Sequence, residues 1–326
     1  MSAGRARHHH RRGPVKLSVV IPTHGRRDLL ERTLRSLDSD ADGPEVEVHV
    51  VDDGADAELD QYVAALPIRL RVDVVSHPEC RGRSVARNSG IDRATGEVLV
   101  FLDGDMEVVP GFLAAHAAEH SDGNTVALGT IVTTREIRHD AFVRYVDSRG
   151  VRKVKPGERI PGRYFLSGNS SVSRPLLDRA GGFDEGFAQY GGEDTEMGYR
   201  LEQSGARFVH AADAVSVHLD LKGVVAMARR LRVYGETTLP LLVQKAPQAG
   251  PELRLDLVHP DLRGESTMGT RMLSRVARIF CRRTFWEPAA HLAAVLPGFV
   301  RADALFDFVR ASAYLDGYRQ HLEKTR

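Results

Sequence analysis

Residues 98–105, which read VLVFLDGD, decide the fold of this chain. The first five are apolar and do not alternate with polar residues, which predicts a strand buried on both faces. Ligands of open α/β sheets bind in the crevice beyond the carboxyl ends of such strands. Asp103 and Asp105 would repel each other there unless a cation lies between them, and hard divalent cations prefer oxygen ligands. The stretch therefore predicts a site for a metal ion and a polyanionic ligand, or else an ordinary Asp-Gly turn.

Strands and helices alternate on both sides of this stretch. Apolar runs predict strands at residues 16–21, 46–51, 70–75 and 98–102, and helical spacing predicts helices at 27–37, 57–65 and 84–94. This alternation is typical of βαβ units in a mainly parallel sheet. The strand at 46–51 ends at Asp52-Asp53-Gly54, so two strands of one sheet deliver acids to a shared crevice.

The pattern changes toward the C-terminus. Further helices are predicted at 111–120, 175–180 and 193–204, short strands within 163–172 and 207–217, and the pattern of 130–155 is ambiguous. After about Lys222, helical patterns rich in arginine continue to the end of the chain. We therefore predict a disordered basic tail at 1–14, an α/β domain at 15–222 and a helical region at 223–326.

Composition excludes several classes of protein. The 326 residues are 42% hydrophobic and 27% charged, as in soluble globular proteins, and the net charge of +1 provides no overall field to recruit nucleic acid. Cys80 and Cys281 lie far apart without metal-ligand spacing, which favours a reduced protein of the cytoplasm over one with a single disulfide. No apolar run has the length of a transmembrane helix, and the basic first residues lack the apolar core of a secretory signal.

Several motifs together resemble a known family. Residues 19–23 (VVIPT), 50–54 (VVDDG), 87–90 (RNSG) and 101–105 (FLDGD) resemble the nucleotide-binding half of the inverting family 2 glycosyltransferases. Residues 191–196 (GGEDTE), followed by Val217-His218, are similar to the acceptor half of chondroitin-polymerase and β-1,4-galactosyltransferase domains. The resemblance covers residues 16–220. It implies a GT-A fold of the α/β class, Rossmann-like with a mainly parallel sheet flanked by helices, to which the C-terminal helices are added.

The resemblance implies a nucleoside-diphosphate sugar as donor, with a UDP-sugar expected. The residues it assigns to the donor pocket are Pro22, Thr23, Arg26, Asp53, Arg83, Asn88, Asp103 and Gly104. Asp53 would contact the base, and Asp103 the ribose or the donor sugar. His24 departs from the usual family pattern, and Asp52-Asp53-Gly54 alone would suit a plain turn.

The resemblance assigns the metal to Asp105 and His218. Either Mn²⁺ or Mg²⁺ would bridge the diphosphate oxygens and neutralise charge on the departing nucleoside diphosphate. His218 follows an apolar strand-like segment, 24 residues after Asp194, as the family pattern expects. An isolated histidine can instead be structural.

The resemblance makes Asp194 the general base. An inverting transfer needs one carboxylate to accept the proton of the attacking hydroxyl. The residues expected to bind the acceptor are Gly168, Asn169, Gly192 and Glu193. The alternatives are a helix start whose acids favour the helix dipole at 193–194 and an ordinary turn at 168–169.

We therefore predict an inverting, metal-dependent glycosyltransferase whose acceptor is a carbohydrate, lipid-linked, peptide or small molecule. Two other functions stay open: a nucleotidyltransferase acting on sugar phosphates and a catalytically inactive nucleotide-sugar-binding module. Against the first, no glycine-rich, lysine-bearing phosphate loop follows the first strand.

A basic amphipathic segment stands out in the C-terminal region. Met272, Leu273, Val276, Ile279 and Phe280 share one helical face between Arg271 and Arg283, and the arginines lie largely on the other. This pattern predicts a helix packed on the domain with solvated arginines, or one that lies on an anionic membrane at its inner face.

Overall fold

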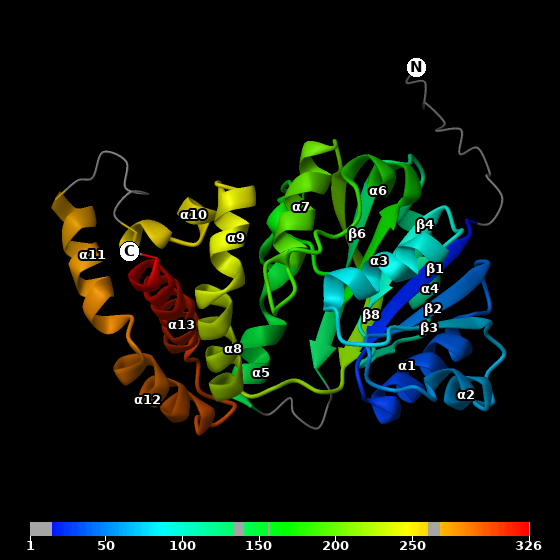
Figure 1. Cartoon of the computed structure of the whole chain (residues 1–326), viewed down its shortest axis with the longest axis horizontal. Coiled ribbons are helices and arrows are strands. Elements are labelled where there is room, and N and C mark those ends of the chain that lie inside the picture. The colour runs from blue at the N-terminus through cyan, green and yellow to red at the C-terminus, as the bar shows by residue number, and fades with distance from the viewer. Residues whose placement is uncertain (1–14, 134–139, 156, 260–267, 326) are drawn as a thin grey trace, which may run out of the picture.

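A single eight-stranded sheet forms the core of one side of the molecule (Figure 1). The computed structural model describes residues 15–133, 140–155, 157–259 and 268–325, so the predicted tail at 1–14 lies outside the described residues. The strand order is β3-β2-β1-β4-β7-β6-β8-β5. The strands are β1 (Leu17–Thr23), β2 (Val46–Asp52), β3 (Val72–Ser76), β4 (Val98–Leu102), β5 (Met106–Val108), β6 (Thr125–Thr133), β7 (Asn169–Ser173) and β8 (Arg207–His218).

The first four strands in this order form a parallel half. Parallel neighbours need crossover connections, and these are supplied by α1 (Arg27–Asp40), α2 (Leu59–Ala64) and α3 (Arg83–Arg93). All five residues of β4 are buried, as its unbroken apolar run predicts. The carboxyl ends of β1, β2 and β4 therefore meet at one edge of the sheet.

The other half of the sheet is mixed. β7 runs antiparallel to both β4 and β6, whereas β6 and β8 are parallel over a bulge between Leu128 and Thr130. β5 pairs antiparallel with β8 and sets Met106 opposite His218. The predicted α/β class is confirmed: six of the eight strands run in one direction, and only β7 and β5 run in the opposite direction.

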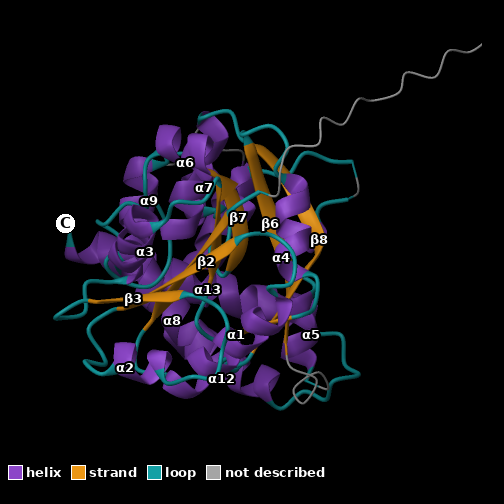
Figure 2. Cartoon of the chain, turned by 90° about the vertical axis from the view of Figure 1, so that its right-hand side faces the viewer, coloured by secondary structure: helices purple, strands orange, loops and turns teal. Residues whose placement is uncertain are grey.

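Helices cover both faces of the sheet (Figure 2). On one face, α1, α2 and α4 (Phe112–Glu119) pack leucines and phenylalanine against Val19 and Ile21 of β1. On the other, α6 (Arg174–Ala180) and α7 (Glu193–Gln203) pack around Phe101, whose ring meets that of Phe183 edge-on at 5.3 Å. Burial of these side chains fixes the helices against both faces of the sheet. We use the word crevice for the region beyond the carboxyl ends of β1, β2 and β4.

The C-terminal helices form a second body beside the sheet (Figure 1). They are α8 (Val224–Glu236), α9 (Thr238–Lys245), α10 (Ala249–Glu252), α11 (Met268–Phe280), α12 (Arg283–Ala294) and α13 (Asp303–Lys324). Their core takes in Phe142 and Tyr145 of α5 (Ala141–Asp147) and, separately, Phe187 and Tyr199 of the α/β part. Residues on both sides of the predicted boundary at 222–223 therefore share these two hydrophobic clusters. None of the helices that the structure describes is both long and apolar enough to cross a membrane.

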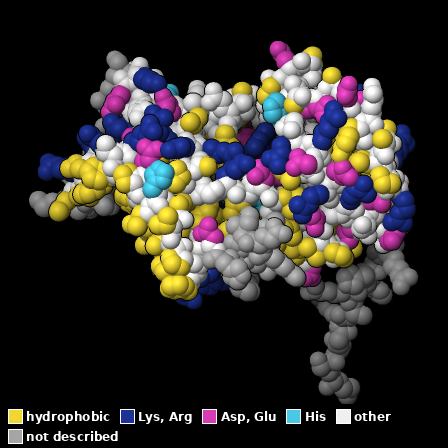
Figure 3. Space-filling view, turned by 90° about the horizontal axis from the view of Figure 1, so that it is seen from below, with side chains coloured by type: hydrophobic (Ala, Val, Ile, Leu, Met, Phe, Trp, Pro, Cys, Tyr) yellow, Lys and Arg dark blue, Asp and Glu magenta, His cyan; other side chains and the backbone are white. Residues whose placement is uncertain are grey.

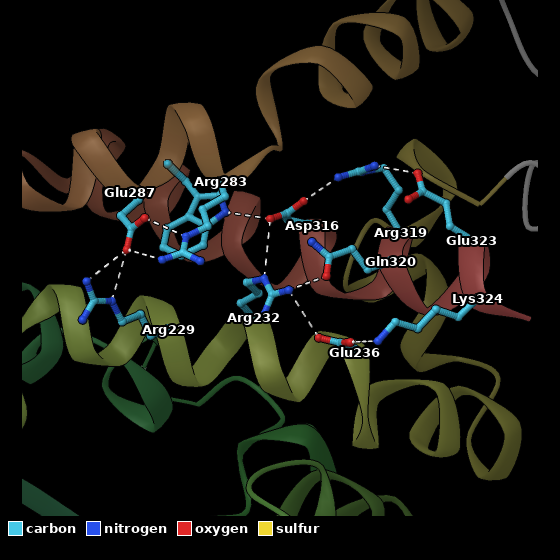
Figure 4. Close-up of polar contacts among 11 residues, drawn as sticks. Arg229, Arg232, Glu236, Arg283, Glu287, Asp316, Arg319, Gln320, Glu323 and Lys324 are labelled. Carbon is cyan, nitrogen blue, oxygen red and sulfur yellow. Dashed lines mark hydrogen bonds and ion pairs between the residues drawn. The ribbon is translucent and has the colours of Figure 1, made fainter.

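A buried acid joins three of these helices (Figure 4). Asp316 of α13 is 1% exposed and accepts hydrogen bonds from the Trp286 indole of α12 at 3.1 Å and from Arg319 at 2.7 Å. Arg232 of α8 lies 3.9 Å from the same carboxylate. A buried charge needs such partners, so the network fixes α8, α12 and α13 relative to one another.

Candidate active site

The carboxyl ends of β1, β2 and β4 place their polar residues at one edge of the sheet, as expected for Thr23, Asp53 and Asp103. The amide of Asp53 donates to the Thr23 carbonyl at 3.0 Å, which joins the ends of β1 and β2. Gly104 lies against the end of β1, where a Cβ atom would be 3.2 Å from the Pro22 carbonyl oxygen. A side chain at 104 would therefore require the Pro22 carbonyl at the end of β1 to move slightly.

Asp53 is the most thoroughly hydrogen-bonded acid of this edge. Its carboxylate accepts from the amides of Arg81 and Gly82 at 2.8 Å each, from the Cys80 thiol at 3.2 Å and from His77 Nδ1 at 3.1 Å. Burial opposes ionisation, but these donors outweigh it and hold the pKa of Asp53 below its usual value. Asp53 therefore stays charged and fixes the loop that leads into α3.

A buried arginine links the two acidic parts of the crevice. Arg87 of α3 is 1% exposed; its Nη2 donates to Asp103 at 3.1 Å, and its Nη1 lies 3.7 Å from the Glu193 carboxylate. Its guanidinium also lies 5.3 Å from the centre of the Phe183 ring. Burial opposes the charge of Asp103, yet Arg87 holds the pKa of Asp103 below its usual value. Arg87 was not among the predicted site residues, although it stands in the motif at 87–90.

Asp105 and His218 face each other across the β5–β8 pairing. His218 Nε2 lies 3.2 Å from Asp105 Oδ2, and both side chains are partly exposed. Burial alone would lower the pKa of His218, but the Asp105 carboxylate raises it above the usual value. A cation would find one imidazole nitrogen and one carboxylate already converging, which fits Mn²⁺ or Mg²⁺.

No cluster of three or more candidate protein ligands for a metal occurs within the described part of the chain. Asp105 and His218 would thus supply only part of a coordination shell. This suits a metal that takes its remaining oxygens from a diphosphate and from water, as Mg²⁺ commonly does. Sequence reasoning brought these two residues together correctly, although they are 113 positions apart.

A second acidic pair begins α7. Asp194 accepts from the Ser167 hydroxyl at 2.6 Å and from the Ser167 amide at 3.2 Å. Burial raises the pKa of both Glu193 and Asp194, and repulsion between the two carboxylates raises the pKa of Glu193 further. Glu193 Oε2 is buried without a hydrogen-bond partner among the described residues. Ser167 was missed from the sequence, where only its position before Gly168 marks it.

Glycines permit the close packing around this pair. Gly192, at φ +96°, precedes α7 in a conformation that favours glycine, and a Cβ atom there would lie 2.9 Å from the Phe187 ring. At Gly168 a Cβ atom would lie 3.0 Å from Asp103 Oδ2. Both glycines therefore permit close packing, buried Gly168 beside Asp103 and half-buried Gly192 at the start of α7.

Asn169 does not line the crevice, and its expected contact with an acceptor is wrong. Its side chain is 2% exposed at the start of β7. Its amide nitrogen donates to the Ala214 carbonyl at 3.0 Å and the Ser216 hydroxyl at 2.9 Å, while its oxygen lies 2.9 Å from His116 Nε2. The amide is used up within the sheet, because β7 is a central strand rather than a turn.

Three predicted donor residues lie farther out. Asn88 accepts from the Phe183 amide at 2.8 Å and donates to the Phe183 carbonyl at 2.9 Å, so it shapes the wall of the crevice. Arg26 is exposed and donates to Asp220 at 3.1 Å, close in sequence to His218. Arg83 is exposed at the first turn of α3.

The C-terminal body also reaches the crevice. The guanidinium carbons of Arg83 and of Arg230 in α8 each lie 5.7 Å from the centre of the Tyr190 ring, which is 41% exposed. Neither arginine has an ion-pair partner among the described residues. Tyr190 stands three residues before Glu193, so two unpaired cations flank the approach to the second acidic pair.

The chain is similar to glycosyltransferases in two family models and in curated relatives. Residues 18–178 match the model of "Glycosyl transferase family 2", and residues 149–219 match that of "N-terminal domain of galactosyltransferase". Validoxylamine A glucosyltransferase of Streptomyces hygroscopicus subsp. limoneus is 30% identical over 270 residues, covering 73% of this chain and 58% of that protein. Chondroitin synthase of Escherichia coli is 27% identical over 264 residues, covering 71% and 38% respectively.

Solved structures share the fold. A mannosyltransferase of Pyrobaculum calidifontis, solved with GDP-Man and Mn²⁺, superimposes with a TM-score of 0.58 at 19% identity and covers 96% of this chain and 89% of that one. The chain spans less than two thirds of the length of the first curated relatives it matches. The predicted resemblance and GT-A-type fold are confirmed.

Proposed function

The chain carries a family 2 glycosyltransferase domain over residues 18–178, and we propose that it catalyses an inverting, metal-dependent transfer of sugar. The donor would be a nucleoside-diphosphate sugar, expected to be a UDP-sugar. One observation carries the proposal. Buried Arg87 holds the donor-side acid Asp103 at 3.1 Å and the base-side acid Glu193 at 3.7 Å. The Arg87 guanidinium thereby holds an acid of the donor side close to an acid of the acceptor side. A single displacement at the anomeric carbon requires donor and acceptor to be held this close together.

On the donor side, Asp53 and the ends of β1 and β2 would hold the base and ribose. Asp103 would meet the ribose or the sugar, and Asp105 with His218 would hold Mn²⁺ or Mg²⁺. The metal, when bound, would neutralise charge on the diphosphate as it leaves. His218 must be neutral to bind metal, so the proton favoured by Asp105 would be released on binding.

On the acceptor side, Asp194 would act as the general base. The acceptor oxygen attacks the anomeric carbon, and its proton passes to the Asp194 carboxylate. The bond from that carbon to the diphosphate oxygen breaks, and the nucleoside diphosphate leaves with the electron pair. Ser167 orients the carboxylate through two hydrogen bonds, and the raised pKa of Asp194 makes it a better proton acceptor than an exposed aspartate.

The decisive experiment replaces Asp194 by asparagine. Turnover of nucleotide sugars should fall by about 10²- to 10⁴-fold, while Mn²⁺-dependent binding of the nucleoside diphosphate stays within a fewfold of the wild type. Asp105→Ala should instead weaken the Mn²⁺-dependent binding of the nucleoside diphosphate, because it removes a proposed metal ligand. Unchanged turnover in Asp194→Asn would remove Asp194 from the base role.

Product analysis separates the remaining alternatives. A nucleotidyltransferase would release pyrophosphate, whereas glycosyl transfer releases a nucleoside diphosphate. A module that has lost catalysis would bind donors without turnover across a panel of carbohydrate, lipid-linked, peptide and small-molecule acceptors. The raised pKa of the Glu193–Asp194 pair favours an active enzyme, because perturbed carboxyl groups cluster at functional sites.

We also propose a cytoplasmic location with peripheral contact to the inner face of a membrane. The contact would run through the segment 271–283 that the sequence marks as amphipathic. A membrane surface would bring lipid-linked acceptors within reach of the crevice.

A further inference from the structure

An unusual apolar surface covers α11, α12 and the residues after them. Eight of the twelve large hydrophobic side chains exposed in the described residues lie between 272 and 299, too many for scattered surface residues. We call this group the α11–α12 patch; its members are Met272, Val276, Ile279, Phe280, Phe285, Leu292, Val295 and Phe299. Figure 3 shows hydrophobic side chains gathered at the end of the molecule where these helices lie.

The apolar stripe of α11 is not the side that packs this helix on the domain. A helix packed on the domain should bury its apolar stripe, yet Met272 and Ile279 are 69% and 54% exposed. The side of α11 that is buried carries Ala277 instead, and Cys281, directly after the helix, is buried with it. The large apolar side chains of α11 therefore face outward, because the helix packs through its small residues.

Two helices contribute to one continuous surface. The rings of Phe280 in α11 and Phe285 in α12 lie 5.0 Å apart between their centres. Leu292 follows Phe285 by two helical turns on the same face of α12, whereas buried Trp286 points in another direction. Because Trp286 is fixed by Asp316, the α12 part of the surface rests on a rigid support.

Free arginines flank the apolar stripe. Arg275 and Arg278 are exposed and stand three residues apart on α11, and exposed Arg282 follows the end of this helix. None of the three has an acidic partner among the residues the structure describes. Arg283, by contrast, is paired with Glu287 (Figure 4). The side chains of Arg271 and Leu273 lie outside the described residues.

We propose that the α11–α12 patch docks on an anionic phospholipid bilayer. Apolar side chains beside unpaired arginines match the acyl boundary and the phosphate groups of such a surface. A second copy of this chain fits less well, because a symmetric dimer would bring the same arginines toward one another. This deepens the membrane contact proposed above, and lipid binding measured without nucleotide sugar keeps it separate from glycosyl transfer.

The test is co-sedimentation of the full chain with vesicles of phosphatidylcholine, with and without phosphatidylglycerol. We expect binding to vesicles that contain phosphatidylglycerol, weaker binding to phosphatidylcholine alone, and loss at high salt because the screening length shortens. Ile279→Ser combined with Leu292→Ser should weaken binding by roughly tenfold or more. Val109→Ser, an exposed valine after β5, is the matched control and should leave binding unchanged.

The charge arm uses Arg275→Ser and Arg278→Ser, each expected to weaken binding to anionic vesicles by about fivefold. These side chains are exposed, so all variants should keep the wild-type melting temperature. Absence of vesicle binding, or binding that Ile279→Ser with Leu292→Ser leaves unchanged, overturns the proposal. Self-association without lipid that the same double variant abolishes would also overturn it, in favour of a second copy of the chain.

Discussion

The acids on the two sides of the crevice are held in opposite ways. Asp53, at the end of β2, accepts hydrogen bonds from four surrounding groups, and its pKa lies below the usual value. Glu193 and Asp194, at the start of α7, are crowded together with few donors, and the pKa of each lies above the usual value. Several hydrogen-bond donors stabilise a carboxylate that must stay charged. Burial beside a second carboxylate instead makes a carboxylate a stronger proton acceptor.

The largest expected effect comes from removing the cation that serves both sides. Arg87→Met leaves Asp103 and Glu193 without their buried partner, so the free energy of unfolding should fall by about 3–5 kcal/mol. Chemical denaturation measures this loss. Arg83→Met, on the exposed first turn of the same helix, is the control and should change stability by less than about 0.5 kcal/mol. Equal stability of the two variants would mean that Arg87 is not the link between the acids.

A smaller loss of stability should follow from neutralising Asp53, the acid with four hydrogen-bond donors. Asp53→Asn presents an amide to groups that donate, so buried donors lose their acceptor and the free energy of unfolding should fall by about 1–3 kcal/mol. Asp28→Asn, an exposed acid at the start of α1, serves as the control.

The pH dependence of the free energy of unfolding tests the charge of Asp53 independently. A carboxyl whose folded pKa is lowered stabilises the protein above its unfolded pKa, near 3.9, and loses that contribution as pH falls through the folded value. Denaturation at neutral and acidic pH should therefore show the Asp53→Asn deficit shrinking on acidification. A deficit that is constant with pH would contradict the assigned ionisation.

The opposite sign is expected at Glu193. Its folded pKa is raised, so the folded state binds the proton more tightly and stability from this group declines as pH rises from the usual carboxyl value through the raised one. Activity should rise with pH as Asp194, the proposed base, ionises at a pKa above its usual value. Glu193→Gln removes the neighbouring charge and should move the acid limb of the kcat/KM profile down by roughly one pH unit. An unmoved limb in this variant would separate Glu193 from the titration of Asp194.

Sequence reasoning captured one side of the crevice better than the other. The β4 run and the acids at 53, 103 and 105 were predicted because a buried parallel strand has a local signature. β6 was not predicted as a strand, and β8 was expected only as short pieces. Without β6, the neighbour of β7, Asn169 looked like a turn residue rather than a buried one.

The missed residues share a physical cause. Arg87 and Ser167 act through contacts between elements far apart in the chain, and no local pattern reports which element will pack against them. The outward orientation of α11 belongs to the same class: amphipathic spacing predicts a helix with two faces, and only the packing of Ala277 and Cys281 shows which one is buried.

The smallest expected effect concerns the reach of the C-terminal body into the crevice. Arg230 of α8 lies beside Tyr190 without an ion-pair partner among the described residues, whereas its neighbour Arg229 pairs with Glu287 at 3.0 Å. Arg230→Ala removes a cation from the approach to the Glu193–Asp194 pair and should raise a substrate KM by about two- to fivefold, as loss of one exposed cation–π contact would.

Arg229→Ala is the matched control, one position along the same helix, and should leave KM unchanged. Measuring KM separately for donor and acceptor tells which side of the crevice Arg230 serves. A change in donor KM would show that Arg230 serves the donor side around Asp53 and Asp103. A change in acceptor KM would show that it serves the acceptor side around Asp194. If both variants behave as the wild type, the C-terminal helices support the crevice only by packing, through the core they share with Phe187 and Tyr199.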